Sequence, residues 1–183
     1  MTITGTITIP QLEAGSFATS PIVTAGAQVT RTADQASMTG TNFSSWYNQA
    51  QGTFYVEANV VNIEESPYLL NSSNLTTTLV YQYVGPTGVL NTYEGSHAAS
   101  ISSGYTSNDY HKSINTYSST SNAMTITFDG KTVNSSAYSG AFSTATGINI
   151  MRNPYVPGSC GHIRKINYYA TALPSAVLQS LTS

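Results

Sequence analysis

The chain has 183 residues, with six lysines and arginines against eight aspartates and glutamates. This length suits one domain with a sizeable hydrophobic core. Because so few basic residues cannot form a surface that holds a phosphate backbone, the composition argues against a nucleic-acid partner. Serine, threonine, asparagine, tyrosine and glycine supply the polar surface instead, and the scarcity of charged helix formers favours an all-β protein.

The N-terminal residues 2–9, "TITGTITI", alternate threonine and isoleucine and predict a strand that Pro10 ends. They lack the basic and apolar regions of a signal peptide. No stretch approaches the roughly 18 apolar residues that cross a bilayer. We therefore expect synthesis in a cytoplasm and no membrane insertion.

Residues 11–34 form an irregular, nearly uncharged segment whose apolar residues repeat at neither 2 nor 3.6. Their apolar density is higher than a free linker has. We therefore divide the chain into an N-terminal strand and extended connector, residues 1–34, and a β-sandwich, residues 35–183. The connector is predicted to run across the sandwich or a neighbouring subunit and to act in assembly. Its predicted assembly residues are the buried Leu12, Phe17 and Ile22 and the neighbouring pair Arg31 and Asp34.

The middle of the chain predicts three strands. Residues 52–61, "GTFYVEANVV", alternate in the manner of a strand with one face in the core, and the core residues are Phe54, Val56, Ala58 and Val60. Residues 76–84, "TTTLVYQYV", are apolar on both faces, so this strand should lie between two layers. A turn at Gly85–Gly88 should return residues 89–95 as its neighbour.

The C-terminal third carries the clearest local signal, an Asp129-Gly130 pair between alternating runs. Such a pair predicts a two-residue hairpin, because both central residues of a type I′ turn need positive φ. Residues 147–152 and 162–170 predict two further strands, the second with a bulge because Ile163 and Ile166 are out of phase. Residues 173–183 predict a helix with Pro174 in its first turn, and its apolar stripe comprises Ala176, Val177, Leu178 and Leu181.

Three segments together resemble a known family. "QLEAGSFATSPIVTAGAQVTRTAD" followed by "FSSWYNQAQGTFYVEANV" resembles the junction in bacteriophage structural proteins where a connector enters a concanavalin A-like, laminin-G-like sandwich. "NAMTITFDGKTV" and "GHIRKINYYATALPSAVLQSLTS" are similar to the family's hairpin and C-terminal ending. The likeness covers residues 11–62 and roughly 108–183, while residues 63–107 match poorly. One departure is the weaker helix cap, where Pro174 and Ser175 replace a Ser-Asp pair and Val177 replaces an acidic residue. The resemblance implies a jelly-roll β-sandwich with a short C-terminal helix and a virion context, and it assigns no ligand site.

The sequence offers little for catalysis. Glycan hydrolases of the wider concanavalin-like fold use paired carboxylates on one strand, and here Glu57 is followed by Asn59 and Asn62, whose amides cannot exchange a proton at a useful pKa. There is no Gly-x-Ser-x-Gly elbow, and the three histidines have no fixed relation to a nucleophile. We predict no enzymatic activity.

Metal and cofactor motifs are also missing. The histidines and Cys160 lack ligand spacing, so no metal site and no cofactor are predicted. Calcium stays open at Asn108 and Asp109, because its oxygen ligands can come from distant loops, although a hydrated loop is the favoured interpretation. Cys160 cannot form an intrachain disulfide and should be a small packed residue.

Among the possible ligands, a glycan is the one that the residue types of the sequence suit best. It needs aromatic faces for sugar C–H groups, with amides and carboxylates beside them for hydroxyls. Tyrosine is also an ordinary strand residue, so most tyrosines should be packed. Trp46 should cover an edge of the sandwich. The candidate site is one predicted loop, which contains Tyr105, Asn108, Asp109, Tyr110 and His111.

These observations predict a non-enzymatic phage virion surface protein that displays a lectin-like domain, as part of a head or tail fibre, for adhesion to host-surface glycan. The alternative is a capsid decoration or cement protein that stabilises the shell, and a glycan hydrolase is third. Expected partners are other virion proteins, a host-surface glycan and further copies of the chain. By analogy with phage fibres, a trimer is favoured. The expected location is the virion surface.

Overall fold

The computed structural model describes residues 5, 12, 21–30, 35–64, 66–73, 78–94, 97–102, 104–138, 142, 144–152 and 160–183. The chain divides into two compact units, residues 1–34 and 35–183. In the first unit Leu12 is fully exposed and Ile22 is half-buried within the single chain, so burial against a neighbouring subunit stays a prediction. The predicted strand at 2–9, Phe17, Arg31 and Asp34 lie outside the described residues, apart from Gly5.

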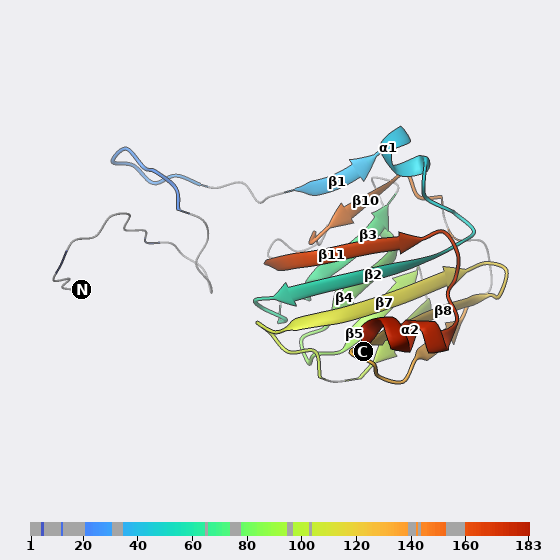
Figure 1. Ribbon diagram of the computed structural model, residues 1–183. Coiled ribbons are helices and arrows are strands. Elements are labelled where there is room, and N and C mark those ends of the chain that lie inside the picture. Colours follow the sequence, from blue (N-terminus) through green and yellow to red (C-terminus); the bar gives the residue numbers. More distant parts are fainter. Residues whose placement is uncertain are drawn as a thin grey trace. The chain divides into compact units, whose positions relative to one another are not determined.

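The second unit is a sandwich of two antiparallel sheets (Figure 1), which confirms the predicted fold class. The six-stranded sheet has the order β1 (Ala36–Thr39), β10 (Gly147–Ile150), β3 (Tyr68–Ser73), β4 (Thr78–Val84), β5 (Leu90–Glu94) and β6 (His97–Ile101). The five-stranded sheet has the order β11 (Gly161–Tyr169), β2 (Gln51–Val60), β7 (Tyr110–Ser118), β8 (Ala123–Phe128) and β9 (Asn134–Ala137).

The core lies between the two sheets. On β2 the predicted inward residues Phe54, Val56, Ala58 and Val60 are all buried, which confirms that face. Strands β4 and β5 pair as predicted through the turn at Gly85–Gly88. Polar side chains cross the core: Gln82 donates to Asn115 Oδ1 at 2.6 Å and accepts from Ser113 Oγ at 2.9 Å. A buried network of this kind costs little when every member is bonded.

The hairpin after β8 is confirmed. Asp129 and Gly130 have φ values of 47° and 68°, as a type I′ turn requires, and Lys131 N–H donates to Phe128 O at 3.0 Å. Further along, Ile126 lies opposite Asn134 rather than Val133, so one additional residue lies between the turn and β9. The Thr127 hydroxyl donates to Lys131 O at 2.6 Å and holds this irregular part of the hairpin.

The predicted bulge in β11 is also confirmed. The register with β2 shifts between Ile163 and Lys165, so Arg164 is the additional residue. Because a bulge re-aims the side chain it carries, Ile163 and Ile166 both pack on the core, while Arg164 points outward.

The C-terminal helix α2 (Ser175–Thr182) forms where predicted, but its face and start differ from the prediction. Pro174 is extended, with ψ 149°, and precedes the helix instead of lying in its first turn. The predicted stripe is wrong in part, because Ala176 and Val177 are exposed. The buried residues are Leu178 and Thr182, since only this side faces the sheet. Neither α2 nor α1 (Thr41–Ser44), the helices of the described residues, has the length and hydropathy of a membrane-spanning helix.

Aromatic residues fill the end of the sandwich next to α1. Trp46 is half-buried there, edge-on to Phe43 and Tyr168 at 5.1 and 4.9 Å between ring centroids. Its Nε1–H donates to Asn42 O at 2.7 Å. Burial raises the pKa of neighbouring Tyr47 to about 12. Trp46 therefore covers an edge of the core, as the sequence predicts.

Candidate functional site

The predicted glycan loop enters β7, and the structure separates its five candidate residues into two groups. Tyr105 and His111 are buried, with exposed fractions of 2% and 7%. The Tyr105 hydroxyl donates to Ala58 O at 3.3 Å, and burial raises its pKa. Its ring lies 4.1 Å from the His111 ring and 5.8 Å from that of Phe128. The prediction that Tyr105 and His111 contact a surface ligand is wrong, because both side chains belong to the interior.

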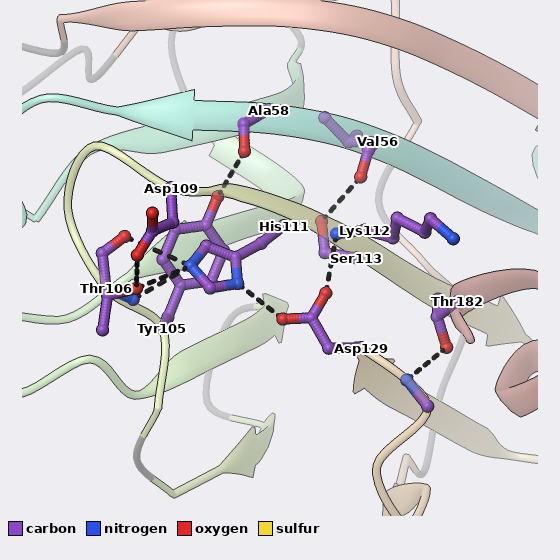
Figure 2. Close-up of polar contacts among 11 residues, drawn as sticks. Val56, Ala58, Tyr105, Thr106, Asp109, His111, Lys112, Ser113, Asp129 and Thr182 are labelled. Atoms are coloured by element: carbon purple, nitrogen blue, oxygen red, sulfur yellow. Dashed lines mark hydrogen bonds and ion pairs between the residues drawn. The ribbon is translucent and has the colours of Figure 1, made fainter.

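His111 instead links the loop to the hairpin (Figure 2). Nε2 lies 3.1 Å from Thr106 N and 3.2 Å from Thr106 O, and on the other side of the ring Nδ1–H donates to Asp129 Oδ2 at 2.5 Å. The second carboxylate oxygen of Asp129 accepts the Lys112 N–H at 2.9 Å. Next to it, Gly130 N–H donates to Thr182 Oγ1 at 3.2 Å. Loop, hairpin and helix α2 are thus joined through Asp129 and Gly130.

A hydroxyl, an imidazole and a carboxylate stand in a row here, with Thr106 Oγ1 3.1 Å from His111 Nε2. In a hydrolase such a row activates the hydroxyl, because the imidazole accepts its proton. Here the Thr106 hydroxyl donates to Asp109 Oδ2 at 2.8 Å instead, and the backbone N and O of Thr106 also lie 3.1 and 3.2 Å from Nε2. The row therefore acts as a structural clamp on the loop. The sequence analysis missed it, although strand alternation places His111 on the inner face of β7 beside Phe128 of β8.

The other three candidates, Asn108, Asp109 and Tyr110, are exposed. Asn108 has φ 70°, a conformation that asparagine tolerates better than most residues, and its N–H donates to Val60 O at 2.8 Å. This bond fixes the turn, while the Asn108 side chain stays in solvent. Tyr110 begins β7 on the outer face of the five-stranded sheet and is 42% exposed.

Two residues from neighbouring strands complete this surface. The Arg164 guanidinium lies over the Tyr110 ring, 3.8 Å from its centroid. Its Nη1 donates to Glu57 Oε1 at 2.7 Å. The sequence analysis missed Arg164 and treated Glu57 only as a candidate acid; the bulge in β11 was the available signal. We call Glu57, Asn108, Asp109, Tyr110 and Arg164 the Tyr110 surface.

Metal ligands do not cluster in the part of the chain that the structure describes. No three histidine, cysteine, aspartate or glutamate side chains there lie close enough to hold an ion. Cys160 is half-buried, and burial raises the pKa of its thiol. At the Tyr110 surface the structure shows a hydrogen-bonded ion pair between Arg164 and Glu57 and the contact of Arg164 with the Tyr110 ring.

Comparison with known proteins adds information on the fold. No protein-family model matches the sequence, and no curated protein is similar to it. The CBM40 domain of the Ruminococcus gnavus IT-sialidase, solved with α2,3-sialyllactose, is similar at a TM-score of 0.60 and 12% identity, over 76% of this chain and 86% of that one. The solved structures that share this fold include carbohydrate-binding domains.

Two further solved structures are similar in fold. A putative carbohydrate-binding protein from Bacteroides ovatus has a TM-score of 0.60 at 12% identity, over 79% of this chain and 43% of that one. The binding domain of botulinum neurotoxin DC, in complex with SialylT, has a TM-score of 0.58 at 12% identity, over 81% of this chain and 38% of that one. At such identities the likeness establishes the β-sandwich fold.

Proposed function

We propose that the chain is a non-enzymatic, lectin-like domain that binds glycan at the Tyr110 surface. The observation that carries this proposal is an exposed tyrosine ring surrounded by polar groups from two neighbouring strands and one loop. The carbohydrate-binding domains that share the fold support it.

The residue chemistry suits a sugar. An aromatic ring gives apolar area for sugar C–H groups, and neighbouring polar groups fix the hydroxyls. The Asn108 amide donates and accepts, the Asp109 and Glu57 carboxylates accept, and Arg164 donates. His111 holds the base of the loop, and Glu57 and Tyr110 hold Arg164, so these groups are positioned before a ligand arrives, which lowers the entropy cost of binding.

The test is a glycan array followed by titration of the wild type and Tyr110→Ala. We expect Tyr110→Ala to weaken binding about tenfold or more, as loss of a central aromatic contact does, with the free energy of unfolding changed by less than about 0.5 kcal/mol. Tyr169→Ala, on the same outer face at the other end of β11, is the matched control and should bind normally. A wild type that binds no glycan, or a Tyr110→Ala variant that binds equally well, would refute the proposal.

We further propose that the domain is displayed on a phage particle, as a head or tail fibre component. The resemblance of residues 11–62 and 108–183 to phage structural proteins supports this location. Mass spectrometry of purified virions, followed by localisation in a density map of the particle, tests it. Absence of the chain from purified virions would contradict this role.

A capsid decoration role is the second candidate, and the first unit favours it. Val23 and Val29 join Leu12 as exposed apolar residues of this unit in the single chain. Such residues are commonly covered by a partner in an assembly, here a shell protein or further copies of the chain. We expect deletion of residues 1–34 to abolish assembly, including the expected trimer, in analytical ultracentrifugation, and to leave glycan binding unchanged.

A further inference from the structure

Arg164 is held in place from two sides. Its guanidinium stacks 3.8 Å from the centroid of the Tyr110 ring, and one nitrogen, Nη1, donates to Glu57 at 2.7 Å. Its side chain is nevertheless 58% exposed. An arginine fixed in this way loses little side-chain entropy when it binds a further group.

The guanidinium keeps donors for a ligand. Arginine carries five N–H groups in a planar fork, and among the described residues the only acceptor of Arg164 is Glu57. The N–H groups of Nε and Nη2 can therefore offer two parallel hydrogen bonds. Parallel N–H groups match the two oxygens of a carboxylate or phosphate.

The local charge is also suited to an anion. Glu57 lies opposite Lys112 of β7 and Lys165 of β11, so three basic residues surround this one carboxylate. Lys112 Nζ bonds the C-terminal Ser183 O, and the Asp129 carboxylate is occupied by His111 and the Lys112 N–H. Asp109, the remaining acid of this surface, accepts from Thr106. Lys165 has no carboxylate partner among the described residues, which leaves the Arg164 side of the surface basic.

We infer that Arg164 determines specificity, by binding the anionic group of an acidic saccharide whose ring lies against Tyr110. This inference rests on the proposed glycan-binding function and names its ligand class. The anionic group is a carboxylate or a phosphate carried by the sugar, since both present paired oxygens to the Nε and Nη2 fork.

The experiment compares saccharides in acidic and neutral pairs by titration calorimetry: sialyllactose with lactose, and glucuronic acid and glucose 6-phosphate with glucose. We expect the wild type to bind at least one acidic member about tenfold or more tightly than its neutral parent, with a preference that falls as salt screens the charges. The sugar acids report carboxylate recognition, and glucose 6-phosphate reports phosphate recognition.

Variants assign the preference to Arg164. Arg164→Lys keeps the charge but removes the planar fork, so it should lower affinity for the acidic member about tenfold more than it lowers affinity for the neutral one. Arg152→Lys, the same change away from this surface, is the matched control and should retain the preference. Equal binding of acidic and neutral members, or a preference that Arg164→Lys retains, overturns the inference and leaves the glycan-binding proposal standing. Binding of no saccharide overturns both.

Discussion

The outer face of the five-stranded sheet differs between its two ends. At one end Tyr55 and Ile114 lie opposite each other on β2 and β7 and are buried beneath Leu178 of α2. At the other end of the same strands, Asn59 lies opposite Tyr110, which remains exposed. One strand pair thus forms the hydrophobic surface on which a helix packs and, four residue pairs further on, a polar surface.

The difference follows from length and residue type. Helix α2 has eight residues and spans about 12 Å, whereas the ten residues of β2 span about 33 Å. The helix can therefore cover only part of the strand. It covers the part with apolar outward residues, because burying Glu57 and Arg164 there would cost their solvation.

The largest effect on stability should come from the end of the five-stranded sheet that α2 covers. Leu178→Ala removes a fully buried side chain from the contact with Tyr55 and Ile114, and should lower the free energy of unfolding by about 2–5 kcal/mol. Urea denaturation measures this change. Val177→Ala alters the neighbouring, 39% exposed residue and should have almost no effect, so a similar loss in both variants would show that α2 is not anchored by Leu178.

A smaller loss of stability is expected between the two ends, at the structural clamp in which His111 contacts Thr106 and Asp129. Asp129→Asn keeps the turn but places an amide N–H₂ or a neutral oxygen against His111 Nδ1, and should lower the free energy of unfolding by about 1.5–3 kcal/mol, as loss of a charged hydrogen bond does. Asp109→Asn changes an exposed carboxylate on the loop that precedes β7; it is the control and should change stability by less than about 0.5 kcal/mol. Equal stability of Asp129→Asn and the wild type would argue against the clamp.

The smallest effect on stability should distinguish Tyr105, in the loop, from Tyr110, the first residue of β7. Tyr105→Phe removes the hydroxyl that donates to Ala58 O, and should cost about 0.5–1.5 kcal/mol of stability. Tyr110→Phe removes an exposed hydroxyl and should cost nothing measurable. Thermal unfolding of both variants checks the pair, and a reversed order would contradict the burial of Tyr105.

The sequence by itself determined part of the strands and turns, while β1, β3, β6 and β7 were not predicted. Alternation defined the inner face of β2, the Asp129-Gly130 pair defined the hairpin, and two out-of-phase isoleucines located the bulge at Arg164. These features are local, because side-chain alternation and positive φ depend on neighbouring residues. The sequence also placed Tyr105, Asn108, Asp109, Tyr110 and His111 in one predicted loop, although Tyr110 and His111 belong to β7.

Only the tertiary structure decided which side chains of that loop face solvent. Tyr105 and His111 were placed in the same predicted loop as Tyr110, but their side chains are buried, and their polar atoms contact Ala58, Thr106 and Asp129. Likewise, Arg164 is 54 residues from Tyr110 in the chain, and only the pairing of β11, β2 and β7 brings them together. Contacts between distant strands depend on sheet order, which alternation along a single strand does not encode.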